Sequence, residues 1–219
     1  MSGPPSSLAD PPRTRKPRGQ GHERHAEILA AAKAMFLADG YEAFTTRKLA
    51  ARVGLSQTGL YVYFKSKEEL LDAVCRQSFM ALGEEFRRAV AAAGEGLSRL
   101  RALGLAYIQF GLAHPDEYRL TFLEGPGLKK MHTADEVAAG HTGAGSNVFL
   151  IIHSELGRLA EAGKLRPVDL TVATHTVWFG LHGLVSIFIA RPGYLRAERE
   201  ALIEDLLDSL EQGLRATLS

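Results

Sequence analysis

Polar side chains suited to a nucleic-acid groove are concentrated in one short stretch, 56-SQTGLYVYFKSKEEL-70. A glutamine amide can pair with the edge of adenine, and a threonine methyl group can contact the methyl group of thymine. Phenol and ammonium groups can donate hydrogen bonds to phosphate oxygens. Glycine lets a backbone come close to such a surface. These residue types favour recognition of double-stranded DNA over a chemical reaction.

These groups need a scaffold that presents them together, and the surrounding residues are typical of a helix-turn-helix. Two short helices can cross at a steep angle only where the backbone bends sharply between them, and Gly54 supplies that bend. Thr45 and Ser56 are residue types preferred at the N-cap of a helix. They predict short helices over Thr46–Arg52 and Gln57–Phe64.

The second of these helices has a predicted outer surface of amide, hydroxyl and phenol groups: Gln57, Thr58, Gly59, Tyr61 and Tyr63. Arg47 projects from the helix before it, where a guanidinium group can reach a guanine or a phosphate. Lys65 and Lys67 follow directly and are placed to contact phosphates beyond the reading helix. Small three-helix units also serve as plain scaffolds, but the outward phenols and the flanking lysines together favour DNA.

The charge of the chain is divided in a way that supports this interpretation. Residues 1–67 carry 11 Lys and Arg against 5 Asp and Glu, whereas residues 68–219 carry 15 against 20. The N-terminal part is therefore suited to a polyanion and the rest is not. The single Cys75 allows no internal disulfide bond, which fits a cytoplasmic protein.

Signatures of enzymes, metal sites and membrane spans are missing from the sequence. Residues 157–164 superficially suggest a phosphate-binding loop, but five residues separate its glycines and Leu165 stands where Ser or Thr is needed. His132 and His141 have no neighbouring pattern of zinc ligands. The longest apolar run, residues 177–190, is shorter than the roughly 20 residues that a membrane span needs. We expect no catalytic residue, no metal, no cofactor and no membrane partner.

Helical spacing continues along almost the whole chain, and no window alternates as a strand does. The apolar repeat that begins at Ile28 ends at Gly40, and Ser66 with Glu69 predicts a capping box before a long amphipathic helix. We expect an all-α protein of about nine helices. The later helices are predicted near residues 100–113, 116–123, 148–163, 169–190 and 202–214, with a glycine-rich loop at 124–146.

A family resemblance appears once these residues are read together. The stretch 28-ILAAAKAMFLADGYEAFTTRKLAARVGLSQTGLYVYFKSKEELLDAV-74 closely resembles the DNA-binding head of TetR-family transcriptional regulators. The elements Thr-Thr-Arg-Lys-Leu-Ala, Leu-Tyr-x-x-Phe and Ser-Lys-Glu-Glu-Leu carry the resemblance. It implies that Arg47, Gln57, Thr58 and Gly59 face bases, while Thr46, Tyr61, Tyr63 and Lys67 hold the DNA backbone.

A second resemblance concerns the C-terminal part. The stretches 107-YIQFGLAHPDEYRLTF-122 and 178-WFGLHG-183 resemble the C-terminal domain of the TetR subgroup named for its Trp-His-Gly signature. The resemblance implies a helical regulatory domain and a homodimer in which the last two long helices pair. Aromatic residues there are candidates to line a site for a small apolar or aromatic ligand, although each also fits an ordinary core: Tyr107, Phe110, Phe122, Phe149, Trp178 and His182.

The sequence thus predicts a disordered, basic, proline-rich tail over residues 1–21, a helix-turn-helix DNA-binding domain over 22–66, and a ligand-binding and dimerisation domain over 67–219. The function that fits is a bacterial, cytoplasmic, TetR-like repressor of palindromic operators, released by a small, mostly apolar ligand. The alternative is an architectural or protein-interaction DNA-binding protein that uses the same fold without a ligand.

Overall fold

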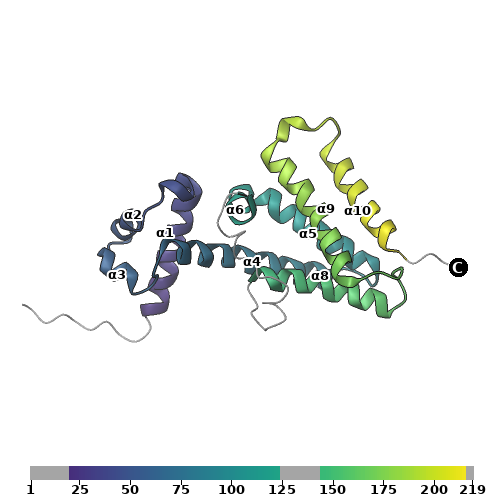
Figure 1. Cartoon of the computed structure of the whole chain (residues 1–219), viewed down its shortest axis with the longest axis horizontal. Coiled ribbons are helices and arrows are strands. Elements are labelled where there is room, and N and C mark those ends of the chain that lie inside the picture. Colours follow the sequence, from purple (N-terminus) through teal and green to yellow (C-terminus); the bar gives the residue numbers. More distant parts are fainter. Residues whose placement is uncertain (1–19, 124–143, 216–219) are drawn as a thin grey trace, which may run out of the picture.

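The computed structural model describes residues 20–123 and 144–215, and within these ranges the chain is all-helical (Figure 1). This part contains nine α-helices, as the sequence predicts, together with one π-helical and one 3-10 turn. The predicted tail lies outside the described residues, except that the first helix already begins at Gln20. The predicted loop at 124–146 also lies outside them, apart from the start of a helix at Ala144. The elements in chain order are α1 (Gln20–Ala43), α2 (Thr46–Arg52), α3 (Gln57–Tyr61), α4 (Lys67–Ala92), α5 (Leu97–Ala113), α6 (Pro115–Tyr118), the π-helical turn η1 (Arg119–Leu123), α8 (Ala144–Glu161), α9 (Leu170–Ala190), the 3-10 turn η3 (Pro192–Tyr194) and α10 (Arg199–Leu214).

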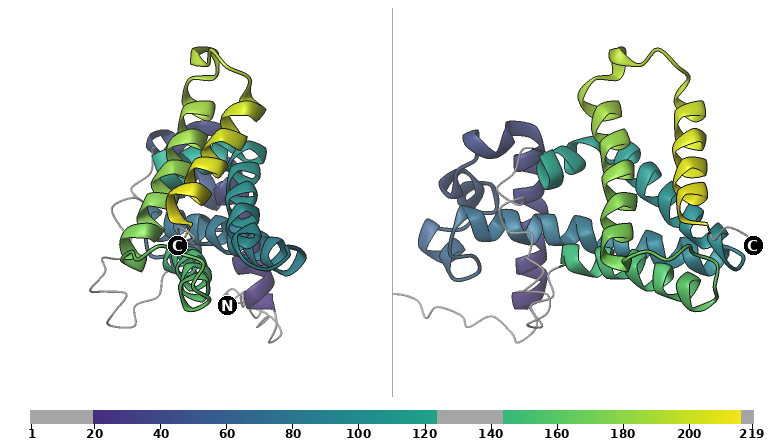
Figure 2. Two further views of the ribbon diagram at one scale, coloured as in Figure 1. Left: turned by 90° about the vertical axis from the view of Figure 1, so that its right-hand side faces the viewer. Right: turned by 45° about the vertical axis from the view of Figure 1, so that its right-hand side comes forward.

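The helices form a small head and a larger bundle joined by α4. Helices α1, α2 and α3 lie at one end of the molecule, and α4 runs from them along the bundle of α5, α8, α9 and α10 (Figures 1 and 2). Helices α9 and α10 form a hairpin whose turn stands out to one side of the bundle, at the top of Figure 1. The predicted DNA-contacting residues and the predicted ligand residues therefore lie on different parts of the fold.

Local sequence signals explain the helices of the head. Gly40 has φ 76° and ψ 169°, so the backbone of α1 bends there, where the sequence predicts a stop. The hydroxyl of Thr45 accepts a hydrogen bond from the N–H of Lys48 at 3.2 Å, and that of Ser56 accepts one from the N–H of Gly59 at 3.0 Å. Both predicted N-caps are confirmed. Gly54, with φ 65°, forms the turn between α2 and α3.

Helix α3 is shorter than predicted, because it ends at Tyr61 and not at Phe64. Beyond Tyr61 the N–H of Tyr63 bonds to the carbonyl of Leu60 three residues back, at 2.9 Å, and this tighter turn ends the regular α-helix. Tyr63 is consequently not an outward residue of α3. It is partly buried against the core of the head.

Two hydrophobic cores share helix α4. The core of the head contains buried residues of α1 to α3 together with Leu70, Leu71, Val74 and Cys75 from the first half of α4. The core of the bundle takes Leu82 and Phe86 from the second half. Burial raises the pKa of the Cys75 thiol to about 11. Cys75 therefore behaves as a core residue.

Glycines on α5 allow its backbone to approach α9 and α10 closely. A Cβ atom at Gly104 would lie 2.5 Å from Leu207, and one at Gly111 would lie 2.5 Å from Val185. On α9, a Cβ atom at Gly180 would lie 3.4 Å from Leu206 of α10, whereas one at Gly183 would have nothing within 4 Å in the described chain.

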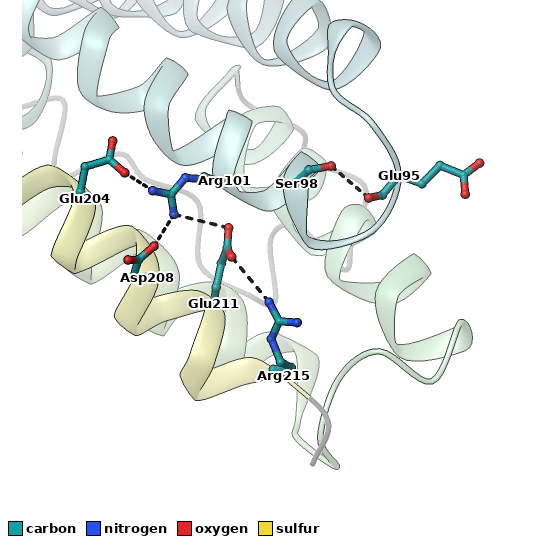
Figure 3. Close-up of polar contacts among 7 residues, drawn as sticks. All are labelled: Glu95, Ser98, Arg101, Glu204, Asp208, Glu211 and Arg215. Atoms are coloured by element: carbon teal, nitrogen blue, oxygen red, sulfur yellow. Dashed lines mark hydrogen bonds and ion pairs between the residues drawn. The ribbon is translucent and has the colours of Figure 1, made fainter. Parts of the chain in front are cut away.

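An ion-pair cluster attaches α10 to α5 (Figure 3). Arg101 donates to Asp208 at 2.7 Å, pairs with Glu204, and lies 3.7 Å from Glu211. Arg215 pairs with Glu211 at 3.9 Å. One guanidinium group from α5 therefore holds three carboxylates spaced along one side of α10.

Helix α9 is longer than the apolar run that the sequence shows. It has 21 residues, which by length and composition alone is enough to cross a membrane. Val177, Leu181 and Val185 on its inner side belong to the core of the bundle, whereas Val172, Phe179 and Ile187 are exposed. The contacts of the inner side are those of a core helix in a helical bundle.

Candidate functional site

The surface formed by α2 and α3 presents most of the residues that the sequence singled out. Arg47, Gln57, Thr58 and Tyr61 are exposed. Thr46, Gly59, Tyr63 and Lys67 are partly buried. The exposed group supplies guanidinium, amide, hydroxyl and phenol donors from two helices, which is the chemistry that base edges and phosphates accept.

Tyr61 connects three of these residues. Its hydroxyl lies 3.5 Å from the hydroxyl of Thr46 on α2 and accepts a hydrogen bond from the amide of Gln57 on α3 at 3.4 Å. These hydrogen bonds, first that of Thr46 and then that of Gln57, lower the pKa of Tyr61. The structure therefore brings Thr46, Gln57 and Tyr61 together across the two helices.

The start of α4 holds the next group of predicted contacts. The hydroxyl of Ser66 accepts a hydrogen bond from the N–H of Glu69 at 3.1 Å, as a capping box requires. The carboxylate of Glu69 bonds to the N–H of Lys65 and not to that of Ser66, so the reciprocal half is displaced by one residue. Lys67 places its Nζ atom 4.0 Å from the centroid of the Tyr41 ring.

Tyr41 is a residue that sequence reasoning missed. Besides lying under Lys67, it donates a hydrogen bond from its hydroxyl to Glu68 at 3.1 Å. Its position directly after Gly40, where the backbone of α1 bends, is the only sequence signal that could have pointed to it. The contacts with residues of α4 are tertiary and have no signature in local spacing.

A cluster of three polar side chains lies inside the bundle. The hydroxyls of Tyr107 and Tyr118 are 3.0 Å apart, and they lie 3.1 Å and 2.5 Å from Nδ1 of His182. Both tyrosines are 1% exposed, and His182 is partly buried. The three residues come from α5, α6 and α9, so the cluster joins three helices at one point.

The surroundings of this cluster are aromatic and uncharged. The rings of Trp178 and Phe122 lie 5.3 Å and 5.6 Å from the imidazole of His182. Burial raises the pKa of Tyr118 to about 12, and burial lowers the pKa of His182. Both shifts favour neutral side chains, and a neutral imidazole that carries its proton on Nε2 can accept a hydrogen bond at Nδ1 from one phenol while the two hydroxyls bond to each other.

The predicted ligand residues divide into two groups in the structure. Tyr107, Phe122, Trp178 and His182 meet at the polar cluster, and Tyr118, which the sequence did not single out, completes it. Phe110 instead contacts His114, with ring centroids 5.1 Å apart. Phe149 contacts His153 and also His175, which lies two turns of α9 before His182. Phe110 and Phe149 therefore pack elsewhere in the bundle and do not belong to the polar cluster.

The short segment Pro115–Leu123 connects the polar cluster to the head. Tyr118 belongs to the cluster, whereas Leu120, two residues later, is buried in the core of the head. In the same segment Glu117 pairs with Lys33 of α1 at 2.8 Å and accepts a hydrogen bond from Ser78 of α4 at 3.1 Å. Tyr118 is therefore linked to α1 and α4 through a segment of nine residues.

No group of three or more His, Cys, Asp or Glu residues is arranged to hold a metal ion within residues 20–123 and 144–215. His132 and His141 lie outside the described residues. The site chemistry of the described chain thus consists of hydrogen bonding, charge and apolar contact.

Comparison with known families gives two matches that together cover most of the fold. Residues 28–74 match the model of the bacterial regulatory proteins of the tetR family. Residues 100–210 match the C-terminal domain described as tetracyclin repressor-like. The first match contains α2, α3 and the start of α4, and the second contains the polar cluster and the α9–α10 hairpin.

Individual relatives agree with these matches. The chain is 30% identical over 148 residues to the HTH-type transcriptional activator FasR of Mycolicibacterium smegmatis, covering 68% of this chain and 67% of FasR. It is 28% identical over 172 residues to the nucleoid occlusion factor SlmA of Serratia proteamaculans, covering 76% of this chain and 83% of SlmA. Several other curated relatives are matched over about half of their length.

A solved structure of a protein with unknown function from Rhodococcus sp. RHA1 superposes with a TM-score of 0.71 at 25% identity, covering 88% of this chain and 95% of that one. The matched family model describes regulatory proteins and FasR is a transcriptional activator, in agreement with the absence of enzyme signatures from the sequence.

Proposed function

The chain belongs to the TetR family of bacterial transcriptional regulators, and we propose that it is a cytoplasmic, homodimeric repressor of palindromic operators that a small, mostly apolar ligand releases from DNA. In this proposal the α2–α3 surface reads the operator, α9 and α10 join two copies, and the Tyr107–Tyr118–His182 cluster responds to the ligand.

The proposed DNA contacts use exposed and partly buried residues of α2, α3 and the start of α4. Arg47, Gln57, Thr58 and Gly59 face bases, and Thr46, Tyr61, Tyr63 and Lys67 hold the DNA backbone. Two such surfaces must lie about 34 Å apart to enter successive major grooves on one side of a palindrome. A single head offers too few contacts for high specificity, so two copies are required.

The proposed dimer contact is the outward side of α9. Val172 and Phe179 are each 59% exposed and Ile187 is 43% exposed, and the smaller exposed residues Thr176 and Gly183 stand between them. This alternation of large and small residues is self-complementary, as a two-fold interface must be. A second copy also supplies the close neighbour that Gly183 lacks in its own chain.

The ligand-response part rests on one observation: the segment Pro115–Leu123 contributes Tyr118 to the polar cluster and Leu120 to the core of the head. A ligand that binds the cluster more tightly in one pose of Tyr118 than in another shifts the equilibrium between the two corresponding poses of the head. The size of that shift is set by the difference in binding free energy between the two poses. No described ion pair or hydrogen bond joins the cluster to Asp, Glu, Lys or Arg. An uncharged ligand with one hydroxyl or carbonyl oxygen therefore suits it better than an ion.

The experiment that tests this function is DNA binding to genomic fragments, including the region upstream of the protein's own gene. We expect a selective shift of dimer size that the double substitution Gln57→Ala, Tyr61→Ala abolishes. On the fragment so identified, neutral oxygen-bearing ligands are then screened for release of the protein. Tyr118→Phe should alter the ligand response, whereas Tyr194→Phe, at a residue that is 73% exposed, is the matched control and should not.

A second candidate function is favoured by the similarity to SlmA, whose name describes nucleoid occlusion. In that case the fold serves as an architectural or protein-interaction DNA-binding module that needs no ligand. Operator affinity would then be insensitive to every ligand tested and to Tyr118→Phe, while a partner protein would bind the DNA-bound dimer. Selective DNA binding that no ligand changes, together with such a partner, would replace the repressor proposal.

A further inference from the structure

Tyr41 touches two successive residues at the start of α4 with two different parts of its side chain. The face of its ring lies under the ammonium of Lys67, 4.0 Å from Nζ to the centroid. Its hydroxyl donates to the carboxylate of Glu68 at 3.1 Å. The ring itself is stacked with that of Phe36, with ring planes 15° apart and centroids separated by 6.0 Å.

We propose that Tyr41 is a positioning residue for DNA binding, which holds Lys67 in the geometry that contacts a phosphate and holds Glu68 aside. The proposal rests on the proposed phosphate contact of Lys67. It adds a residue that needs no contact with DNA of its own, because it acts through the lysine that does.

The physical reason lies in the flexibility of a lysine and in the charge of its neighbour. A free lysine loses much rotamer freedom when it binds a phosphate. The negative face of an aromatic ring attracts the ammonium beforehand and still leaves N–H donors free for the phosphate oxygens. A ring that is already packed on the head's core can order the lysine at little further loss of freedom.

The carboxylate of Glu68 must be held away from the DNA, whereas the ammonium of Lys67 must be held towards it. Its carboxylate would repel a phosphate if it extended towards DNA. The hydroxyl of Tyr41 keeps it at the far end of the ring, and Ser66 and the backbone N–H of Glu68 also hold the carboxylate near the start of the helix. Tyr41 therefore separates the two charges: the cation lies over the ring face and the anion lies at the hydroxyl.

The test uses substitutions that keep the shape of the side chain. Tyr41→Phe keeps the ring and removes the hydroxyl, and replacement of Tyr41 by pentafluorophenylalanine keeps the shape but reverses the charge distribution of the ring face. Each is made with Lys67 intact and with Lys67→Gln. The probe is a fluorescein-labelled duplex enriched from a random pool by the unmodified protein, titrated by anisotropy at several salt concentrations.

With Lys67 intact, the pentafluorophenylalanine protein should bind about 2- to 5-fold more weakly than Tyr41→Phe, the size of an exposed cation–π contact. In the Lys67→Gln background this difference should vanish. Lys67→Gln alone should weaken binding and reduce the slope of log affinity against log salt by about 1 for each protomer.

Two results would overturn the inference, and they can be told apart. If Lys67→Gln changes neither affinity nor salt slope, the phosphate contact itself is wrong and the positioning role falls with it. If Lys67→Gln weakens binding, the contact between Lys67 and a phosphate stands. If the two ring variants then differ in DNA affinity equally in both backgrounds, or do not differ at all, Tyr41 has only a structural role.

Discussion

The buried polar cluster allows a quantitative prediction about stability. Tyr118→Phe removes the hydroxyl that lies 2.5 Å from Nδ1 of His182 and 3.0 Å from the hydroxyl of Tyr107. Tyr107 remains 3.1 Å from the same Nδ1 atom and can donate to it alone. The imidazole therefore keeps a partner, and we expect Tyr118→Phe to lower the free energy of unfolding by about 1 kcal/mol.

Removing the hydroxyls of both Tyr107 and Tyr118 should lower the free energy of unfolding by more than the sum of the two single substitutions. Tyr107→Phe alone leaves the shorter Tyr118–His182 bond in place, so its expected effect is again about 1 kcal/mol. The double substitution leaves Nδ1 of His182 without either phenol. A buried acceptor without a partner adds about 1 to 3 kcal/mol, so we expect a loss of about 3 kcal/mol in total, roughly 1 kcal/mol beyond the sum of the single changes.

Urea unfolding of the four proteins measures this cycle. Trp178 is the only tryptophan of the chain and lies 5.3 Å from the His182 ring, so its fluorescence reports the cluster, and circular dichroism reports the helices. Because the protein is expected to dimerise, all four are compared at one concentration. Strictly additive losses, or a double variant as stable as Tyr118→Phe, would refute the account of a shared acceptor.

Three further predictions concern packing, protonation and charge. Gly111→Ala drives a methyl group against Val185 and should lower the free energy of unfolding by about 1 to 2 kcal/mol in urea titrations. Gly213→Ala places its methyl group in open space and should raise the free energy of unfolding by up to about 1 kcal/mol. Equal effects of the two substitutions would disprove the close approach at Gly111. Since burial lowers the pKa of His182, the unfolded chain takes up this proton first as pH falls below about 6.5. Thermal stability should decline below that pH, and His182→Gln should reduce the decline; an unchanged pH profile would contradict this. Arg101→Met should accelerate hydrogen exchange in α10, more at low than at high salt, and an effect independent of salt would contradict the ion-pair account.

The helices of the head were predictable because their signals are local. Thr45 and Ser56 cap the helices that they were predicted to cap, and Gly40 and Gly54 turn the chain where only glycine does so readily. The family and the all-α fold followed from the same local patterns. The end of α3 was missed by three residues because the tightened turn after Leu60 depends on packing of Tyr63 against the core.

The buried cluster was predictable only in part. The sequence offered Tyr107, Trp178 and His182 as candidates, but it gave no reason to join them with Tyr118. His114 leaves the helical conformation and Pro115 starts a new helix, so the phase of α5 cannot be carried forward to Tyr118. Aromatic composition alone likewise could not separate these residues from Phe149.

Helix α4 carries a consequence for building chimeric regulators. Its first half contributes Leu70, Leu71, Val74 and Cys75 to the core of the head, and its second half contributes Leu82 and Phe86 to the core of the bundle. A head transferred to another regulator with a junction at residue 66 would leave four of its own core residues behind in the donor chain. A junction between Cys75 and Leu82, in unbroken helical phase, keeps each core together. Leu120 has to travel with the head, because it fills the same core from a distant part of the sequence.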